Sequence, residues 1–312
     1  MYKICSFIAL ILLSGCVADN ARMPQPPYTP ELLVDFEASE GITFNAAGEL
    51  FVAANRGVYR VSPDGSAVRI ADTYTNLGLA GYGASDILMA DFGPTNIFRD
   101  GENDDGIVWQ ITRDGEKTEF ATGIADPNFV VVHADGTFLV SDDGTDKIYK
   151  VGTDGRWRIW SQAVPYPNGL VYSLDGRTLY VAQIFSQLGP VVFDNKLWSI
   201  DVDEDGRAGA ARVVAEVGEG GLDGLALDRL GRVYIAENPA GKIWRFDPAS
   251  DELIVVAEGV DRAASLVFGE GQFDHKSLFV STTFNGGGKV WRVPVGIEGA
   301  PVERFDKRCT AR

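Results

Sequence analysis

A short strand with an aromatic residue at its centre recurs along most of this chain. Each copy places apolar or aromatic residues at alternate positions, as in KIWRF from Lys242, which is typical of a strand with one buried face. The central aromatic residues are spaced by 50, 40, 49, 46 and 47 positions: Tyr59, Trp109, Tyr149, Trp198, Trp244 and Trp291. Such a period indicates a repeated supersecondary unit.

Two apolar segments precede each aromatic strand and another follows it. Around KIWRF, the preceding segments are GLAL and RVYIA, and the following one is Leu253–Ala257; other outer segments are Thr118–Ala121 and Arg212–Ala215. The connections are rich in Gly, Asp, Asn and Pro, which favour tight turns. Four antiparallel strands repeated six times predict an all-β fold, a six-bladed β-propeller. A sandwich would need Greek-key connections, and a solenoid would not link its strands as hairpins.

Seven segments compete for the six outer positions of such a propeller. The additional segment, Glu31–Phe36, precedes the first blade. We expect it to close the ring against the last blade, near Val302–Phe305, because an open propeller would leave sheet edges unpaired. The predicted propeller covers residues 31–306, and a short tail, 307–312, follows it.

The first residues have the pattern of a targeting segment. The apolar run Ile4–Leu13 is too short to span a bilayer and is followed by LSGC, which ends at Cys16. This ending resembles a bacterial lipoprotein processing box, so we expect residues 1–15 to be removed and Cys16 to be lipidated; a plain signal peptide is the alternative. Val17 in place of an Asp favours an outer-membrane anchor facing the periplasm. The proline-rich residues 16–30 are expected to form a semi-extended tether.

Charge and cysteine content narrow the possible partners. The formal net charge of −16 disfavours nucleic acid and anionic lipid, so membrane contact is expected only through the lipid. Acidic clusters instead attract hard cations. Of the three cysteines, Cys309 alone would remain unmodified after processing, which excludes an intramolecular disulfide. We expect the protein to be a monomer.

Four blades carry an oxygen-bearing side chain at the head of the first strand. In each, this residue lies eight positions before the turn glycine: Glu40, Asn128, Asn168 and Asp223. The first strand of each blade lines the channel of a propeller, so equal register places the four side chains at one height around one axis. Two blades offer Leu77 and Ala264 there, which have no side-chain oxygen.

Two carboxylates and two amide oxygens in one circle suit a hard cation. Ca²⁺ is the predicted ion, with Mn²⁺, Mg²⁺ or Zn²⁺ as alternatives. Taken singly, Pro-Asn-Gly at 167–169 and Asp-Gly at 223–224 are ordinary turn sequences; the shared register is what indicates a site. His133 lies near the opposite end of its strand and is interpreted as a structural turn residue.

Several segments resemble the senescence-marker-protein (regucalcin) and gluconolactonase family and, more distantly, the paraoxonases. They are EGITF, PNGLVYSLDGRTLYVA, LDGLALDRLGRVYIAEN and SLVFGEGQFDHKSLFVSTT. The resemblance implies a six-bladed propeller with a divalent cation at the channel mouth. It makes Glu40, Asn168 and Asp223 metal ligands, gives Asp223 the role of catalytic acid/base, and lets Asn128 contact metal or substrate. An Asp often follows that Asn in the family, whereas here Phe129 does.

Loops between the second and third strands should surround the mouth. Two of them are long, Phe92–Gly106 and Ile184–Asn195. Loops on a rigid scaffold commonly decide specificity. Four phenylalanines are candidate apolar walls for a substrate, or residues that pack within the loops: Phe98, Phe185, Phe193 and Phe284.

The predicted function is metal-dependent hydrolysis of a small lactone or related ester. The cation would polarise the carbonyl and stabilise the oxyanion, and Asp223 would activate water or shuttle a proton. The alternative is a non-catalytic, metal-stabilised binding module at the cell envelope, because a propeller fold alone does not imply activity. A condensation activity like that of strictosidine synthase fits less well, because it would not require the ring of metal ligands.

Overall fold

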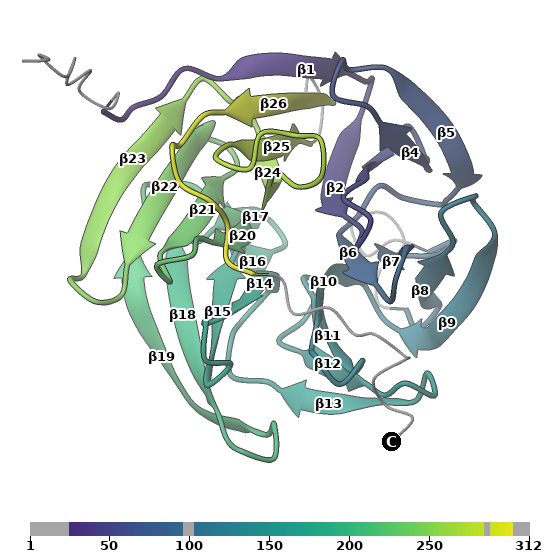
Figure 1. The fold of residues 1–312 in the computed structure, drawn as a ribbon. Coiled ribbons are helices and arrows are strands. Elements are labelled where there is room, and N and C mark those ends of the chain that lie inside the picture. The colour runs from purple at the N-terminus through teal and green to yellow at the C-terminus, as the bar shows by residue number, and fades with distance from the viewer. Residues whose placement is uncertain (1–24, 96–102, 284–287, 302–312) are drawn as a thin grey trace, which may run out of the picture.

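Six four-stranded antiparallel sheets surround a central channel, with the first strand of each blade innermost (Figure 1). The computed structural model describes residues 25–95, 103–283 and 288–301, in which all regular elements are β-strands. The predicted six-bladed propeller is therefore confirmed. No helix in these ranges is long and apolar enough to cross a membrane.

Each blade follows the predicted order from the channel outward. Blades 1 and 2 consist of β2 (Ser39–Phe44), β3 (Leu50–Ala54), β4 (Gly57–Val61), β5 (Ala67–Asp72), β6 (Leu79–Tyr82), β7 (Asp86–Asp91), β8 (Gly106–Ile111) and β9 (Lys117–Ile124). Blades 3 and 4 consist of β10 (Pro127–Val132), β11 (Phe138–Asp142), β12 (Ile148–Val151), β13 (Trp157–Ser161), β14 (Pro167–Tyr172), β15 (Thr178–Gln183), β18 (Lys196–Val202) and β19 (Ala208–Glu216). Blades 5 and 6 consist of β20 (Leu222–Leu227), β21 (Val233–Glu237), β22 (Lys242–Asp247), β23 (Glu252–Glu258), β24 (Ala263–Phe268), β25 (Leu278–Thr282), β26 (Lys289–Val293) and β1 (Glu31–Asp35).

The N-terminal strand β1 closes the ring as the outer strand of the last blade. It pairs antiparallel with β26, with Glu31 opposite Arg292 and Leu32 opposite Trp291. The expected closure by this segment is confirmed, and its hydrogen-bonded partner is β26. Because the first and last strands of the ring pair in one blade, opening the ring requires breaking that sheet.

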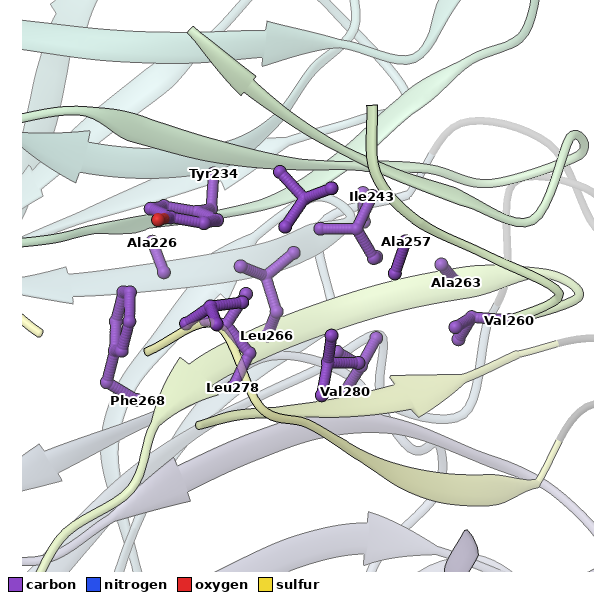
Figure 2. Packing of buried hydrophobic residues seen from close by; sticks show 14 residues of the cluster. Ala226, Tyr234, Ile243, Ala257, Val260, Ala263, Leu266, Phe268, Leu278 and Val280 are labelled. Carbon is purple, nitrogen blue, oxygen red and sulfur yellow. The ribbon is translucent and has the colours of Figure 1, made fainter. Parts of the chain in front are cut away.

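The hydrophobic core is divided among the interfaces between blades. Each buried cluster in the described residues joins two neighbouring blades. Figure 2 shows the cluster between blades 5 and 6, in which Tyr234 and Ile243 face Leu266 and Val280. A blade therefore buries both of its faces only in the complete ring.

In blades 2 to 5, the recurring aromatic residue donates a hydrogen bond to a side chain at the end of the second strand. Trp109 Nε1 donates to Asp91 at 3.0 Å, Trp198 Nε1 to Gln183 at 2.8 Å, and Trp244 Nε1 to Glu237 at 2.7 Å. In blade 3, Tyr149 Oη donates to Asp142 at 3.4 Å. We call Asp91, Asp142, Gln183 and Glu237 the outer acceptors. In these four blades the acceptor pairs with an indole or phenol hydrogen that Phe lacks.

The segment 184–195, predicted as a loop, contains a hairpin of two strands. β16 (Phe185–Leu188) pairs with β17 (Val191–Phe193) as a separate sheet beside the channel (Figure 1). Several predictions concern residues outside the described ranges: the signal segment 1–15, lipidation of Cys16, Phe98, Phe284, and the strand near 302–305.

Candidate functional site

A β-bulge begins the first strand of most blades and sets the direction of the predicted ligands. On β2, Ser39 pairs with Ala54 and Ile42 with Val52, so β2 carries one extra residue between the two pairs. The same shift occurs at the heads of β10, β14, β20 and β24. The extra residues include Glu40, Asn128, Asn168 and Asp223. A bulge re-aims a side chain locally, and here it does so at each predicted ligand.

Backbone contacts between blades place these residues at one level. A Cβ on Gly41 would collide with the carbonyl of Leu77, one on Gly169 with that of Asp223, and one on Gly224 with that of Ala264. Glycine is needed at these positions because neighbouring backbones touch. In blades 3 and 6, where Phe129 and Ser265 replace the glycine, serine hydroxyls from the second strands make the junction: Ser141 donates to Asn168 O at 2.7 Å, and Ser281 donates to Glu40 O. The equal height expected from the register is confirmed.

Glu40 receives hydrogen bonds from two other blades. Thr283 Oγ1 donates to Glu40 Oε2 at 2.9 Å, and Asn128 Nδ2 lies 3.5 Å from Oε1. Asn128 Nδ2 also donates to Asp143 Oδ2 at 3.1 Å. Glu40 is half-buried, whereas Asn128 and Asp143 are buried. The carboxylate therefore lies at the mouth, with amide and hydroxyl groups around it.

Asp223 is held by one buried amide. Asn238 Nδ2 donates to Asp223 Oδ2 at 2.9 Å and to the carbonyl of Ala263 at 3.1 Å. Both amide hydrogens are thus used, which fixes the orientation of Asn238. Because Asn238 is fully buried, its position cannot relax into solvent, and Asp223 is held in one rotamer.

Three buried oxygen atoms in this region have no hydrogen-bond partner among the residues that the structure describes. They are Asn168 Oδ1, Asp143 Oδ1 and Asn238 Oδ1. Buried acceptors are normally satisfied, and each exception calls for an explanation such as an ion or water. Among the residues described, no three His, Cys, Asp or Glu side chains form a metal site by themselves, so a cation would also need amide oxygens. Glu40, Asn168 and Asp223, with Asn128 beside them, fit a hard cation in this respect.

The carboxyl groups at the mouth disfavour one another's ionisation. Burial raises the pKa of Glu40 to about 7, although hydrogen bonds from Thr283 and Asn128 lower it. Burial, and then the charge of Glu40, raise the pKa of Asp223 well above its usual range, against the bond from Asn238. The same two causes raise the pKa of Asp143. A divalent cation would remove this repulsion and favour the ionised forms.

Sequence analysis did not identify Asp143, Asn238 and Thr283 as site residues. Each lies one position beyond the second strand of its blade, immediately after Asp142, Glu237 or Thr282. An alignment of the ends of the second strands would have placed them in one register. The heads of the first strands supply the predicted ligands, and the residues that follow the second strands supply the side chains that bond to them.

The other predicted site residues have different surroundings. Phe185 is buried and packs against Phe193, with ring centroids 5.5 Å apart, so these two aromatics do pack within their segment, while Phe193 stays 40% exposed. His133 Nδ1 lies 3.0 Å from an Asp135 carboxylate oxygen in the turn after β10, at the end of that strand opposite Asn128, as expected. A surface hollow of about 520 Å³ lies between the outer strands β9 and β13, away from the predicted ligands on the innermost strands.

Comparison with known proteins identifies relatives of this chain. Residues 26–284 match the model of the SMP-30/gluconolactonase/LRE-like region. A regucalcin from Xenopus laevis is 28% identical over 133 residues, which are 41% of this chain and 41% of that protein. The pentonolactonase of Haloferax volcanii is 24% identical over 230 residues, 66% of this chain and 75% of that protein.

Solved structures share the architecture. The structure of a calcium-binding protein, regucalcin, from Agrobacterium tumefaciens superimposes with a TM-score of 0.68 at 21% identity, covering 90% of this chain and 97% of that one. At this identity the likeness establishes the fold. Because the family model spans most of the chain, the protein belongs to the SMP-30/gluconolactonase/LRE-like family.

Proposed function

We propose that the protein hydrolyses lactones or related esters with a divalent cation at the channel mouth, Ca²⁺ foremost. The observation that carries this proposal is the group of buried oxygens without partners beside Glu40 and Asp223. Family membership and the pentonolactonase relative support the reaction class. The Agrobacterium structure is of a calcium-binding protein, which supports the choice of ion.

At the mouth, several residues would bind the ion, and one of them would also transfer a proton. Glu40, Asn168 and Asp223, with Asn128 as a fourth candidate, would hold the cation, which when bound supplies Lewis-acid polarisation of a carbonyl. Asp223 would accept a proton from the attacking water and return it to the leaving alkoxide of the ring. Its Oδ2 is fixed by Asn238, which leaves Oδ1 for the proton.

Asp143 lies at the position where it can orient a substrate hydroxyl or the water. Its Oδ2 is bonded to Asn128, and Oδ1 has no hydrogen-bond partner in the described parts of the chain. With the cation bound, the ionised form of Asp143 is favoured, so Oδ1 would accept a hydrogen bond from the substrate hydroxyl or the water.

A panel of lactones tests this function. The full chain, stripped with chelator and reloaded with Ca²⁺, Mn²⁺ or Zn²⁺, should open at least one lactone ring, measured by titration of the released acid. Rates should depend on the metal. Bound metal without turnover of any member would contradict the proposal and favour a non-catalytic binding module.

We also propose that the protein is anchored by lipid on Cys16 to the outer membrane of a bacterium and faces the periplasm. The support is the LSGC sequence and the proline-rich sequence that follows it. Cys16→Ser should move the protein from the membrane to the soluble fraction. An unchanged membrane fraction would contradict the lipid anchor.

A further inference from the structure

The hairpin of β16 and β17 has one apolar face. Phe185 pairs with Phe193 and Leu188 with Val191 across the two strands. Paired residues in an antiparallel hairpin, and residues two positions apart on one strand, lie on the same face. A register shift between Phe185 and Gln187 gives β16 one extra residue, so Phe185 and Leu188 share one face although they are three positions apart. With their partners Phe193 and Val191 they form a continuous apolar face, whereas the Gln187–Val192 pair belongs to the other side.

Burial changes along this apolar face. Phe185 is buried, but Val191 is 47% and Phe193 is 40% exposed. Single exposed apolar residues are common on proteins, but here they adjoin one another and continue a buried aromatic pair. Within the described residues, nothing covers the outer half of the face.

The hairpin is fixed beside Asp223. A Cβ on Gly221 would collide with the ring of Phe193, so that ring lies over the backbone two residues before Asp223. Leu222 N donates to Asp194 O at 3.3 Å, directly after β17. The apolar face consequently starts next to the candidate site and extends outward from Phe193 to Val191.

We propose that the hairpin face binds the apolar substituent of a lactone whose carbonyl lies at the ring of ligands. This inference rests on the proposed hydrolase function and adds a substrate class: lactones with an alkyl or aryl side chain in preference to polyhydroxylated ones. The reason is that hydroxyl groups against Val191 and Phe193 would lose hydrogen bonds to water and gain none.

The test compares lactones with one ring and growing side chains, from unsubstituted γ-butyrolactone to its 5-butyl, 5-hexyl and 5-octyl derivatives. For the wild-type protein, kcat/KM should rise about two- to fourfold per methylene until the face is covered. Val191→Ser should flatten this dependence. Val192→Ser is the matched control, because Val192 is equally exposed, at 44%, but on the opposite face. A polyhydroxylated lactone should show no difference among the three proteins.

Binding separates this inference from the hydrolase proposal. The corresponding 5-alkyl-2-pyrrolidinones are not hydrolysed, and their affinity for the metal-loaded full chain can be measured by calorimetry. If affinity rises with chain length and Val191→Ser removes the rise, the face binds apolar groups even if no lactone is turned over. A flat series, or an equal effect of Val192→Ser, overturns the inference. Thermal melts confirm that both variants remain folded, since both side chains are exposed.

Discussion

Consecutive residues at the ends of the second strands differ sharply in their surroundings. Glu237 is an outer acceptor: its Oε2 receives the indole hydrogen of Trp244 at 2.7 Å, and its Oε1 receives the backbone N–H groups of Glu219 at 2.8 Å and Gly220 at 2.9 Å. Asn238, the next residue, bonds the candidate site residue Asp223, and its Oδ1 has no partner in residues 25–95, 103–283 and 288–301. Both residues are almost completely buried.

Whether the oxygens of a buried polar side chain all have protein partners separates structural from candidate functional residues. The outer acceptors join the second strand to the aromatic strand and, at Asp91 and Glu237, to the incoming connection from the previous blade. Their oxygens have protein partners. The mouth residues Asn168, Asp143 and Asn238 retain oxygens without partners, which is where a ligand would supply the missing interaction. Polar type alone does not distinguish the two sets.

The largest expected effect is on catalysis at the mouth. Asp223→Ala should lower kcat/KM for any lactone that is hydrolysed by about 10²–10⁴-fold, because it removes the proton acceptor. It should also abolish the change in melting temperature on chelation. If wild type and Asp223→Ala respond identically to chelator, the ring is only a set of turns and has no bound metal.

The second-largest effect is expected on stability, when an outer acceptor is removed. Glu237→Ala should lower the free energy of unfolding by about 3 kcal/mol, because an indole and two backbone donors lose their partner. The melting temperature should fall, yet chelation should still lower it further. Denaturant titration with and without Ca²⁺ measures both. Loss of the metal response in this variant would show that the outer acceptors also support metal binding at the mouth.

Chelation of the wild-type protein should have a somewhat smaller effect on stability. A ligand that binds only the native state stabilises it by about 2.7 kcal/mol at a hundredfold excess over its Kd. Removing it should lower the melting temperature by several degrees, and Ca²⁺ should restore it. His133→Ala should behave as wild type, since His133 lies away from the mouth.

This metal response should depend on pH. The pKa of Glu40 is raised from 4.5 to about 7, so the metal-free folded state is most stable when this carboxyl is neutral and loses stability as pH rises through about 7. Metal binding needs the ionised form. The chelator-induced fall in melting temperature should therefore be larger at pH 8 than at pH 5.5. Equal falls at both values would mean that Glu40 does not bind the ion.

The smallest effect is expected at Asn238. Asn238→Ala removes the donor that orients Asp223 but leaves the predicted ligands in place, so kcat should fall about tenfold. The pH profile should shift upward, because the hydrogen bond from Asn238 lowers the pKa of Asp223. A loss of stability with unchanged kcat and pH profile would assign Asn238 a purely structural role.

Much of the fold follows from local sequence pattern. Alternating apolar residues, turn glycines and the aromatic period predict the blades, because each strand buries one or both faces in a regular sheet. The register of Glu40, Asn128, Asn168 and Asp223 against the turn glycines predicts their common height. Glycines such as Gly41 and Gly169 keep that height because neighbouring backbones touch there.

Other features depended on contacts between distant segments. The sequence by itself determined a six-bladed ring with four oxygen-bearing residues at one level. Only the tertiary structure paired β1 with β26, turned the long segment 184–195 into an apolar hairpin over Gly221, and brought Asp143, Asn238 and Thr283 to the ring. These outcomes depend on which face a strand end presents and which blade lies beside it, and neither is encoded in the spacing of residues along one strand.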